Sequence, residues 1–187
     1  MPDPSNSFAP MRRFLLVVPG LFLSSFAAMA APPTLTAEEC NVWQREQSFA
    51  RSLAAHDAAA FAQHVGENAA FGVSTPQPIR GREAIVKRWA GLIEGKQVAL
   101  RWYPTRVVMV PGVADTAWSS GPSLIEVLDP KAKDRYLLGA FHSVWHKDAD
   151  GVWRVLFDDG VEQRPVGAAE VAAFESGRAD CQVGTGT

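Results

Sequence analysis

The sequence has little of the features that mark several specialised classes of protein. Its 187 residues include only two cysteines, and 18 basic against 20 acidic side chains leave a formal charge of −2 without a long run of either sign. A basic stretch is the usual electrostatic mark of a nucleic-acid-binding protein, so we expect no nucleic-acid partner. A composition of 47% hydrophobic and 20% charged residues excludes collagen-like, coiled-coil and wholly disordered chains.

Several catalytic and cofactor-binding motifs are also missing. The chain has no Gly-x-Gly-x-x-Gly after a predicted strand, no P-loop, no Gly-x-Ser-x-Gly and no His-Glu-x-x-His. Nothing therefore supports a nucleotide cofactor, serine-hydrolase chemistry or a catalytic metal. The two cysteines lie far apart, without a histidine pair beside them, and do not have the spacing of a zinc site. We predict no cofactor and no metal.

The longest apolar stretch lies near the N-terminus. Arg12-Arg13 precede the apolar residues 14–27, and Ala28-Met29-Ala30 follows as a small-x-small site. This order is typical of a secretory signal peptide, so residues 1–30 are predicted to be removed by cleavage after Ala30. The mature chain would then be periplasmic or secreted, without a membrane span.

Two alternatives at the N-terminus stay open. The segment from Phe14 to Ala30 could be a retained anchor, but it is short for a bilayer span and contains Pro19-Gly20. The ten residues before Met11 carry no signal feature, which makes Met11 an alternative start.

Cys40 and Cys181 lie near the two ends of the mature chain. An even number of cysteines in an oxidising compartment predicts a disulfide, with two unpaired thiols as the alternative. The bond would tie the first helix to the C-terminal tail, and closing so long a loop is worth about 5 kcal/mol in the chain-entropy model.

The first half of the mature chain is predicted to be mainly helical. After a short leader, residues 31–35, Thr36-Ala37-Glu38-Glu39 forms a capping box that opens a helix to about Ala55. Asp57 is the N-cap of a short helix through Val65, and a third helix is predicted over Arg82–Ile93.

The second half is predicted to consist mainly of strands. Apolar residues alternate with polar or small ones there, Pro104 should bend the chain, and Asp150-Gly151 is a hairpin signal. Residues 161–187 are predicted to be a tail with a short helix over 168–174. The expected strands are 69–73, 98–102, 105–110, 116–121, 123–128, 135–145 and 153–158.

The order of these elements resembles the nuclear transport factor 2-like superfamily, the cone-shaped fold that ketosteroid isomerases, SnoaL-type polyketide cyclases and scytalone dehydratase share. It is most similar to small exported bacterial members with a domain of unknown function. The resemblance covers residues 36–160. Its matching blocks are Trp43–Ala50 with Asp57, Arg80–Ile85 with Trp89, Trp102-Tyr103-Pro104, Ala114–Ala117 with Gly121, Gly139–Trp145, and Asp150–Gly160.

This resemblance implies an α+β fold, in which three N-terminal helices pack in the concavity of a strongly curved antiparallel sheet of about five or six strands. Such a sheet encloses a pocket between itself and the helices. The fold hosts isomerases, dehydratases, cyclases and binding modules alike, so it does not specify an activity.

Glu46 is the most informative single residue. At 100° per residue it lies within the apolar stripe of the first predicted helix, which also carries Val42, Trp43 and Phe49. A carboxylate that faces an apolar interior must be paired or protonated. It could be a pocket acid/base with a raised pKa, or it could bind buried backbone N–H groups, a Trp indole, or an arginine such as Arg80 or Arg82. We favour the structural role.

Alternation along the strand over 135–145 places Phe141, Ser143 and Trp145 on one face and His142 on the other. Ketosteroid isomerases take a pocket carboxylic acid from a strand in this position. Neither inward residue is acidic here, which disfavours that mechanism. His142 is kept as a third catalytic candidate after Glu46 and Asp158, and His56 and His64 are expected at the surface.

Asp158 and Asp159 end the last predicted strand, and one of them should face the pocket mouth; turn formation before Gly160 is the alternative. The residues expected to contact a ligand are Trp43, Glu46, Trp102, Trp118, Phe141, Ser143 and Asp158.

Three functions remain open. The favoured one is binding of a small, largely apolar molecule in a Trp-lined pocket, with a homodimer through the sheet as a further partner to consider. The second is a cofactor-independent isomerase, dehydratase or cyclase that uses Glu46 with Asp158 or a histidine. The third is a protein-interaction domain that works through its sheet face.

Overall fold

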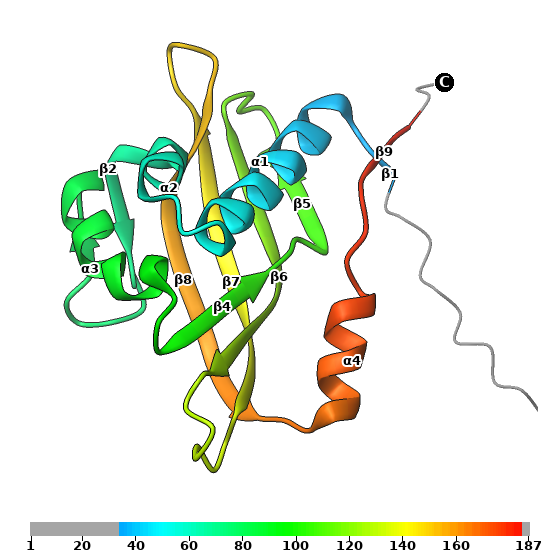
Figure 1. Cartoon of the computed structure of the whole chain (residues 1–187). Coiled ribbons are helices and arrows are strands. Elements are labelled where there is room, and N and C mark those ends of the chain that lie inside the picture. Colours follow the sequence, from blue (N-terminus) through cyan, green and yellow to red (C-terminus); the bar gives the residue numbers. More distant parts are fainter. Residues whose placement is uncertain (1–33, 185–187) are drawn as a thin grey trace, which may run out of the picture.

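The computed structural model describes residues 34–184; residues 1–33 and 185–187, and with them the predicted signal peptide, lie outside the described residues. Four helices pack against a strongly curved sheet (Figure 1). Helix α1 (Ala37–Ala54) lies across the sheet, α2 (Ala58–His64) and α3 (Arg82–Glu94) lie beside the β2 edge, and α4 (Ala168–Ser176) lies on the opposite side. The strands are β1 (Thr34–Leu35), β2 (Val65–Phe71), β3 (Ile79–Arg80), β4 (Val98–Trp102), β5 (Arg106–Met109), β6 (Thr116–Val127), β7 (Tyr136–Lys147), β8 (Trp153–Pro165) and β9 (Gln182–Val183).

Seven strands form the main sheet in the order β3-β2-β8-β7-β6-β4, and β5 also pairs with β6. Neighbouring strands are antiparallel except β2 and β8, which are parallel. A parallel pair needs a crossover rather than a hairpin, and the chain runs through β3, α3 and β4–β7 between β2 and β8. The predicted α+β cone is confirmed, while its sheet is mixed rather than wholly antiparallel.

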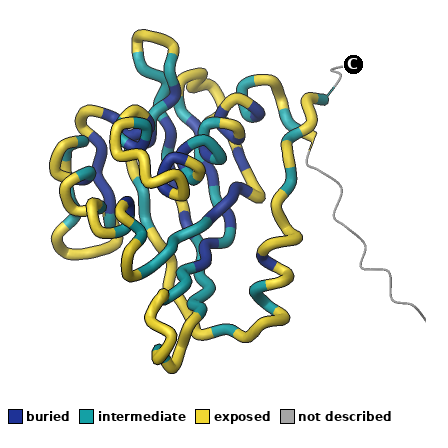
Figure 2. The backbone as a smooth tube through the Cα atoms, viewed as in Figure 1, coloured by how far each residue is buried: buried dark blue, intermediate teal, exposed yellow. Residues whose placement is uncertain are grey.

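The predicted capping box fixes the start of α1. The Glu39 backbone N–H donates to the Thr36 hydroxyl at 3.2 Å, and the Thr36 N–H donates to the Glu39 carboxylate at 2.9 Å. The apolar stripe of α1, with Trp43, Phe49 and Leu53, is buried against the sheet. Figure 2 shows the buried positions gathered in α1 and the central strands, so the core lies between this helix and the concave face.

Strand β6 is continuous where the sequence predicts two strands separated at Pro122. On one side, residues 121 and 122 face the break between β4 and β5, so the missing N–H of Pro122 costs no ladder bond there. Gly121 is required at this point because a Cβ atom would collide with the Tyr103 carbonyl oxygen. Pro122 therefore does not end the strand, because no residue of β4 or β5 pairs with β6 at this position.

Strand β8 also differs from the prediction. It continues through Pro165, so residues 161–165, predicted as tail, pair with β7. The helix predicted over 168–174 is present as α4, whose Phe174 packs against Tyr103 and Leu124. Strand β2 begins at Val65, four residues before its predicted start, because it follows α2 without a loop.

The chain returns to α1 after α4 through residues 177–183, here called the C-terminal strap. Cys40 and Cys181 form a disulfide with a Cα–Cα distance of 5.7 Å, the pairing expected from the cysteine count. The indole N–H of Trp43 and the side-chain amide of Gln47 donate to the Ala179 carbonyl at 3.2 and 3.0 Å. Strand β9 in the strap pairs in parallel with β1. Both ends of the described chain are thus fastened to α1.

Among residues 34–184, no helix has the length and apolar character needed to cross a membrane.

Candidate functional site

A buried polar cluster lies where α1 crosses the sheet. Glu46, in the middle of α1, is 0% exposed. Its Oε1 accepts a hydrogen bond from the Trp102 indole at 2.7 Å, and its Oε2 accepts from the Ser119 hydroxyl at 2.6 Å and the Trp145 indole at 2.9 Å. The same Trp145 N–H is 3.0 Å from Ser119 Oγ. The structure thus realises the predicted Trp-indole pairing of Glu46.

Neither arginine considered as a partner reaches Glu46. Arg82 pairs with Glu67 at 2.9 Å and donates to the Val65 carbonyl, while Arg80 is exposed. Burial raises the pKa of Glu46, and the hydrogen bonds from Ser119, Trp102, Trp145 and Ser143 oppose that rise. Since every one of these donors is neutral, no full positive charge compensates an ionised Glu46.

Asp158 reaches the same interior because of an irregularity in β8. Trp145 pairs with Val155 whereas Val144 pairs with Phe157, so Leu156 is an extra residue. Such a β-bulge reverses the alternation of side chains, and Val155 and Asp158 consequently point to the same side. Ser143, which is fully buried, donates to Asp158 Oδ2 at 2.8 Å.

The charge of Glu46 acts on Asp158. Burial raises the pKa of Asp158 to about 7; the Ser143 hydrogen bond opposes this shift, and the charges of Glu46 and Asp159 reinforce it. Ser143 also contributes a hydrogen bond at Glu46. Burial thus raises the pKa of both carboxyl groups, and the charge of Glu46 adds to the rise at Asp158.

Asp158 opens on its other side to a pocket of about 230 Å³ between α3 and the β2–β8 edge. Four apolar side chains line it, two from the β2–β3 region and two from α3, and Arg88, Asp158 and Asp159 are its charged groups. The apolar lining residues are Phe71, Ile79, Trp89 and Leu92.

Sequence reasoning named Asp158 but missed most of this pocket. Trp89 and Leu92 come from α3, three positions apart on one face of that helix, and this spacing is the signal that points to the pocket. Phe71 and Ile79 come from β2 and from β3, a strand that no local pattern predicted. Asp159 lines the pocket beside Asp158, and its carboxylate accepts from the Ser74 backbone N–H at 2.6 Å.

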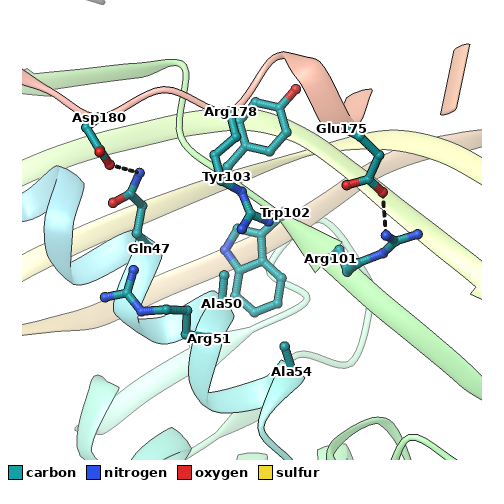
Figure 3. A pocket seen from close by; sticks show the side chains of 10 residues that line it. All are labelled: Gln47, Ala50, Arg51, Ala54, Arg101, Trp102, Tyr103, Glu175, Arg178 and Asp180. Carbon is teal, nitrogen blue, oxygen red and sulfur yellow. Dashed lines mark hydrogen bonds and ion pairs between the residues drawn. The ribbon is translucent and has the colours of Figure 1, made fainter. Parts of the chain in front are cut away.

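The tryptophans expected to line one ligand pocket lie in different places. Trp43 is a core residue bound to the C-terminal strap. Trp102 binds Glu46 and borders a second pocket of about 360 Å³ between α1, β4 and the strap (Figure 3). Phe141 is buried beside Trp102, with ring centroids 6.5 Å apart.

Trp118 and His142 require a correction as candidate site residues. Their rings stack on each other, with centroids 5.4 Å apart, on the face of the sheet opposite Ser119 and Ser143. Trp118 precedes Ser119 and His142 precedes Ser143 in the same strands. Adjacent strand residues point to opposite faces, so the two rings lie on the outer face. Neither residue can reach Glu46 or Asp158 from there.

His64 is not the surface residue expected from the sequence. It is 4% exposed, its Nδ1 lies 2.7 Å from the Ala60 carbonyl and its Nε2 lies 3.0 Å from Ser48 Oγ. Burial, reinforced by the charge of Arg45, lowers its pKa to about 4, so it is neutral at ordinary pH. Within residues 34–184, no group of three His, Cys, Asp or Glu side chains is placed to hold a metal ion.

Of three comparisons with known proteins, only the search of solved structures found similar chains. A scan against protein-family models and a search of curated proteins found no match. A scytalone dehydratase-like protein from Novosphingobium aromaticivorans superposes with a TM-score of 0.57 at 12% identity, covering 80% of this chain and 95% of that one. The fold is that of the nuclear transport factor 2-like superfamily.

Two further structures with the nuclear transport factor 2-like fold are similar over a smaller part of this chain. A ketosteroid isomerase-like protein from Erwinia carotovora atroseptica has a TM-score of 0.53 and 14% identity, covering 67% of this chain and 96% of that one. A protein of unknown function from Shewanella oneidensis has a TM-score of 0.52 and 14% identity, covering 65% and 97%. At such low identities the similarity establishes the fold alone. The activity has to be argued from the residues of the site.

Proposed function

We propose that this chain binds a small, largely apolar molecule in the pocket between α3 and the β2–β8 edge, with Asp158 as its main polar contact. The observation that carries the proposal is one inward-turned carboxyl group in a pocket whose other walls are largely apolar. Ligand sites commonly combine apolar walls with a few placed polar groups. A volume of about 230 Å³ suits a molecule of one or two rings.

The form of Asp158 determines what it recognises. With a pKa of about 7, it is protonated in a large part of the molecules at neutral pH. A protonated carboxyl donates a hydrogen bond, so a ligand carbonyl or hydroxyl oxygen fits it. Arg88 lines the same pocket and adds a positive charge toward a polar end of the ligand.

A second candidate is proton-transfer catalysis, and the raised pKa of Asp158 favours it. A general base works best when its pKa lies near the working pH. In its ionised form, Asp158 could take a proton from a carbon next to a ligand carbonyl, forming an O–H bond as the C–H bond breaks, and then return it. Ketosteroid isomerase-like and scytalone dehydratase-like structures share the fold, which supports this candidate by analogy only.

Hydrogen–deuterium exchange distinguishes the two candidates. Cyclohexanone in D₂O is the probe, with binding followed by protein NMR shifts and exchange of its α-hydrogens followed by ligand NMR. Binding without faster exchange supports a binding module, and exchange that Asp158→Asn slows about 100-fold supports catalysis. Asp134→Asn, at an exposed position that does not line the pocket, is the matched control. If cyclohexanone shifts no signal of Phe71, Trp89 or Leu92, the pocket assignment is wrong.

We further propose that the mature chain begins after Ala30 and is periplasmic or secreted. The residues of the predicted signal peptide support this location, and so does the disulfide, a bond typical of oxidising compartments. N-terminal sequencing of the exported protein tests the cleavage point. A homodimer through the sheet remains a prediction that light scattering would test.

A further inference from the structure

The pocket between α1, β4 and the C-terminal strap has a different chemistry from the pocket at Asp158. Three arginines approach it from three separate parts of the chain: Arg51 from α1, Arg101 from β4 and Arg178 from the strap (Figure 3). Trp102 and Tyr103 form its aromatic wall, and the pocket measures about 360 Å³. The lining of this pocket therefore combines arginine side chains with aromatic rings.

The charges in this pocket do not cancel. Arg101 is paired with Glu175 and Glu126. Within residues 34–184, Arg51 and Arg178 make no ion pair, and both line the pocket. Asp180 is the remaining carboxylate, and it is held by the neutral amide of Gln47 at 3.4 Å. Three arginines against Glu175 and Asp180 leave one positive charge in the lining, although the whole chain is formally −2.

We propose that this pocket binds a small organic acid, with a carboxylate held by Arg51 and Arg178 and an apolar ring against Trp102 and Tyr103. Arginine is suited to this task because its planar donors match a carboxylate in pairs. One excess positive charge matches a monoanion. The indole N–H of Trp102 is already bound to Glu46, so only the ring of that side chain is offered to the ligand.

The position of Arg178 depends on the C-terminal strap. The disulfide at Cys181 and the hydrogen bonds of Trp43 and Gln47 to Ala179 hold the residues that directly follow Arg178 against α1. The site therefore lies where the C-terminal strap contacts α1. It shares no lining residue with the pocket proposed above for an apolar molecule.

Calorimetric titration with benzoate tests this proposal, and benzamide, which has the same shape without the charge, is the matched control ligand. We expect saturable benzoate binding at about 1 mM or below, and benzamide binding at least about tenfold weaker. Arg51→Gln and Arg178→Gln should each weaken benzoate binding about tenfold. Arg106→Gln, an exposed arginine on the outer face over Trp118, should leave it unchanged.

A gain of affinity gives an independent check that a folding defect cannot imitate. Asp180→Asn removes the competing carboxylate while keeping its shape, and we expect benzoate to bind a few-fold more tightly. Equal affinity for benzoate and benzamide, or no effect of the two arginine substitutions, would overturn the proposal. So would displacement of benzoate by inorganic phosphate at similar concentration. A loss of benzoate binding in Asp158→Asn, with the arginine variants unaffected, would place the acid in the other pocket.

Discussion

The carboxyl group of Glu46 accepts three hydrogen bonds from side chains on three strands of the sheet, so its chemistry is tied to stability as much as to function. In Glu46→Gln, the new NH₂ group would face at least one indole or hydroxyl donor. We expect a loss of about 1–3 kcal/mol in the free energy of unfolding, because a buried donor is left unpaired. Urea denaturation measures it.

Glu67→Gln is the control for this substitution, because Glu67 is an exposed carboxylate paired with Arg82 on the surface. It should change the free energy of unfolding by less than about 1 kcal/mol. Equal effects at positions 46 and 67 would show that the buried hydrogen bonds contribute nothing specific.

Asp158 should make stability depend on pH. Its pKa rises from 3.8 to about 7 on folding, so within that range the folded chain binds more protons than the unfolded one. Its stabilising contribution is present at low pH and is lost as pH rises through this window, by up to about 1.4 kcal/mol per pH unit. His64 opposes this trend, since its pKa falls from 6.5 to about 4 and its contribution is lost as pH drops through that range.

The difference in unfolding free energy between wild type and Asp158→Asn isolates the aspartate, because His64 is present in both. We expect this difference to move in favour of the variant between about pH 4 and about pH 7 and to level off above that. A difference that stays constant over that interval would contradict the raised pKa of Asp158.

Strands and helices show where the sequence was sufficient. The capping box at Thr36 and the N-cap at Asp57 are local patterns that predicted the starts of α1 and α2, and the apolar stripe around Glu46 predicted the buried face of α1. The bulge at Leu156 and the continuity of β6 through Pro122 depend on neighbouring strands that are distant in sequence. For the same reason Asp158 could be named, but not the pocket that Phe71 and Ile79 complete.

A pair of glycines in the sheet tests this dependence on neighbouring strands. Gly121→Ala would push a Cβ atom into the Tyr103 carbonyl oxygen, whereas a Cβ atom at Gly160 meets nothing within 4 Å. We expect Gly121→Ala to lower the free energy of unfolding by about 1–3 kcal/mol through overpacking. Gly160→Ala should be close to neutral. Thermal or urea unfolding of both variants is the measurement, and similar losses would mean that the β4–β5 break tolerates a side chain.

The closure of the whole chain onto α1 rests on few contacts. The second, smaller cluster around Phe174 is separate from the main core, and the strap beyond it is held by the Cys40–Cys181 bond and the hydrogen bonds to Ala179. A disulfide across 141 positions restricts the unfolded chain strongly, while the strap itself buries little apolar surface. The covalent link therefore contributes where packing is weakest.

Replacing both cysteines with serine should lower the free energy of unfolding by about 2–5 kcal/mol. The mechanism predicts that most of this loss comes from a less restricted unfolded state, so the fold of residues 36–165 should persist and far-ultraviolet circular dichroism should change little. Reductant should lower the unfolding midpoint of the wild type and leave the double variant unaffected. Because Arg178 lies in the strap, the same substitution should also weaken benzoate binding at constant folded fraction. Unchanged benzoate affinity in the folded double variant would show that hydrogen bonding to Ala179 positions the strap without the disulfide.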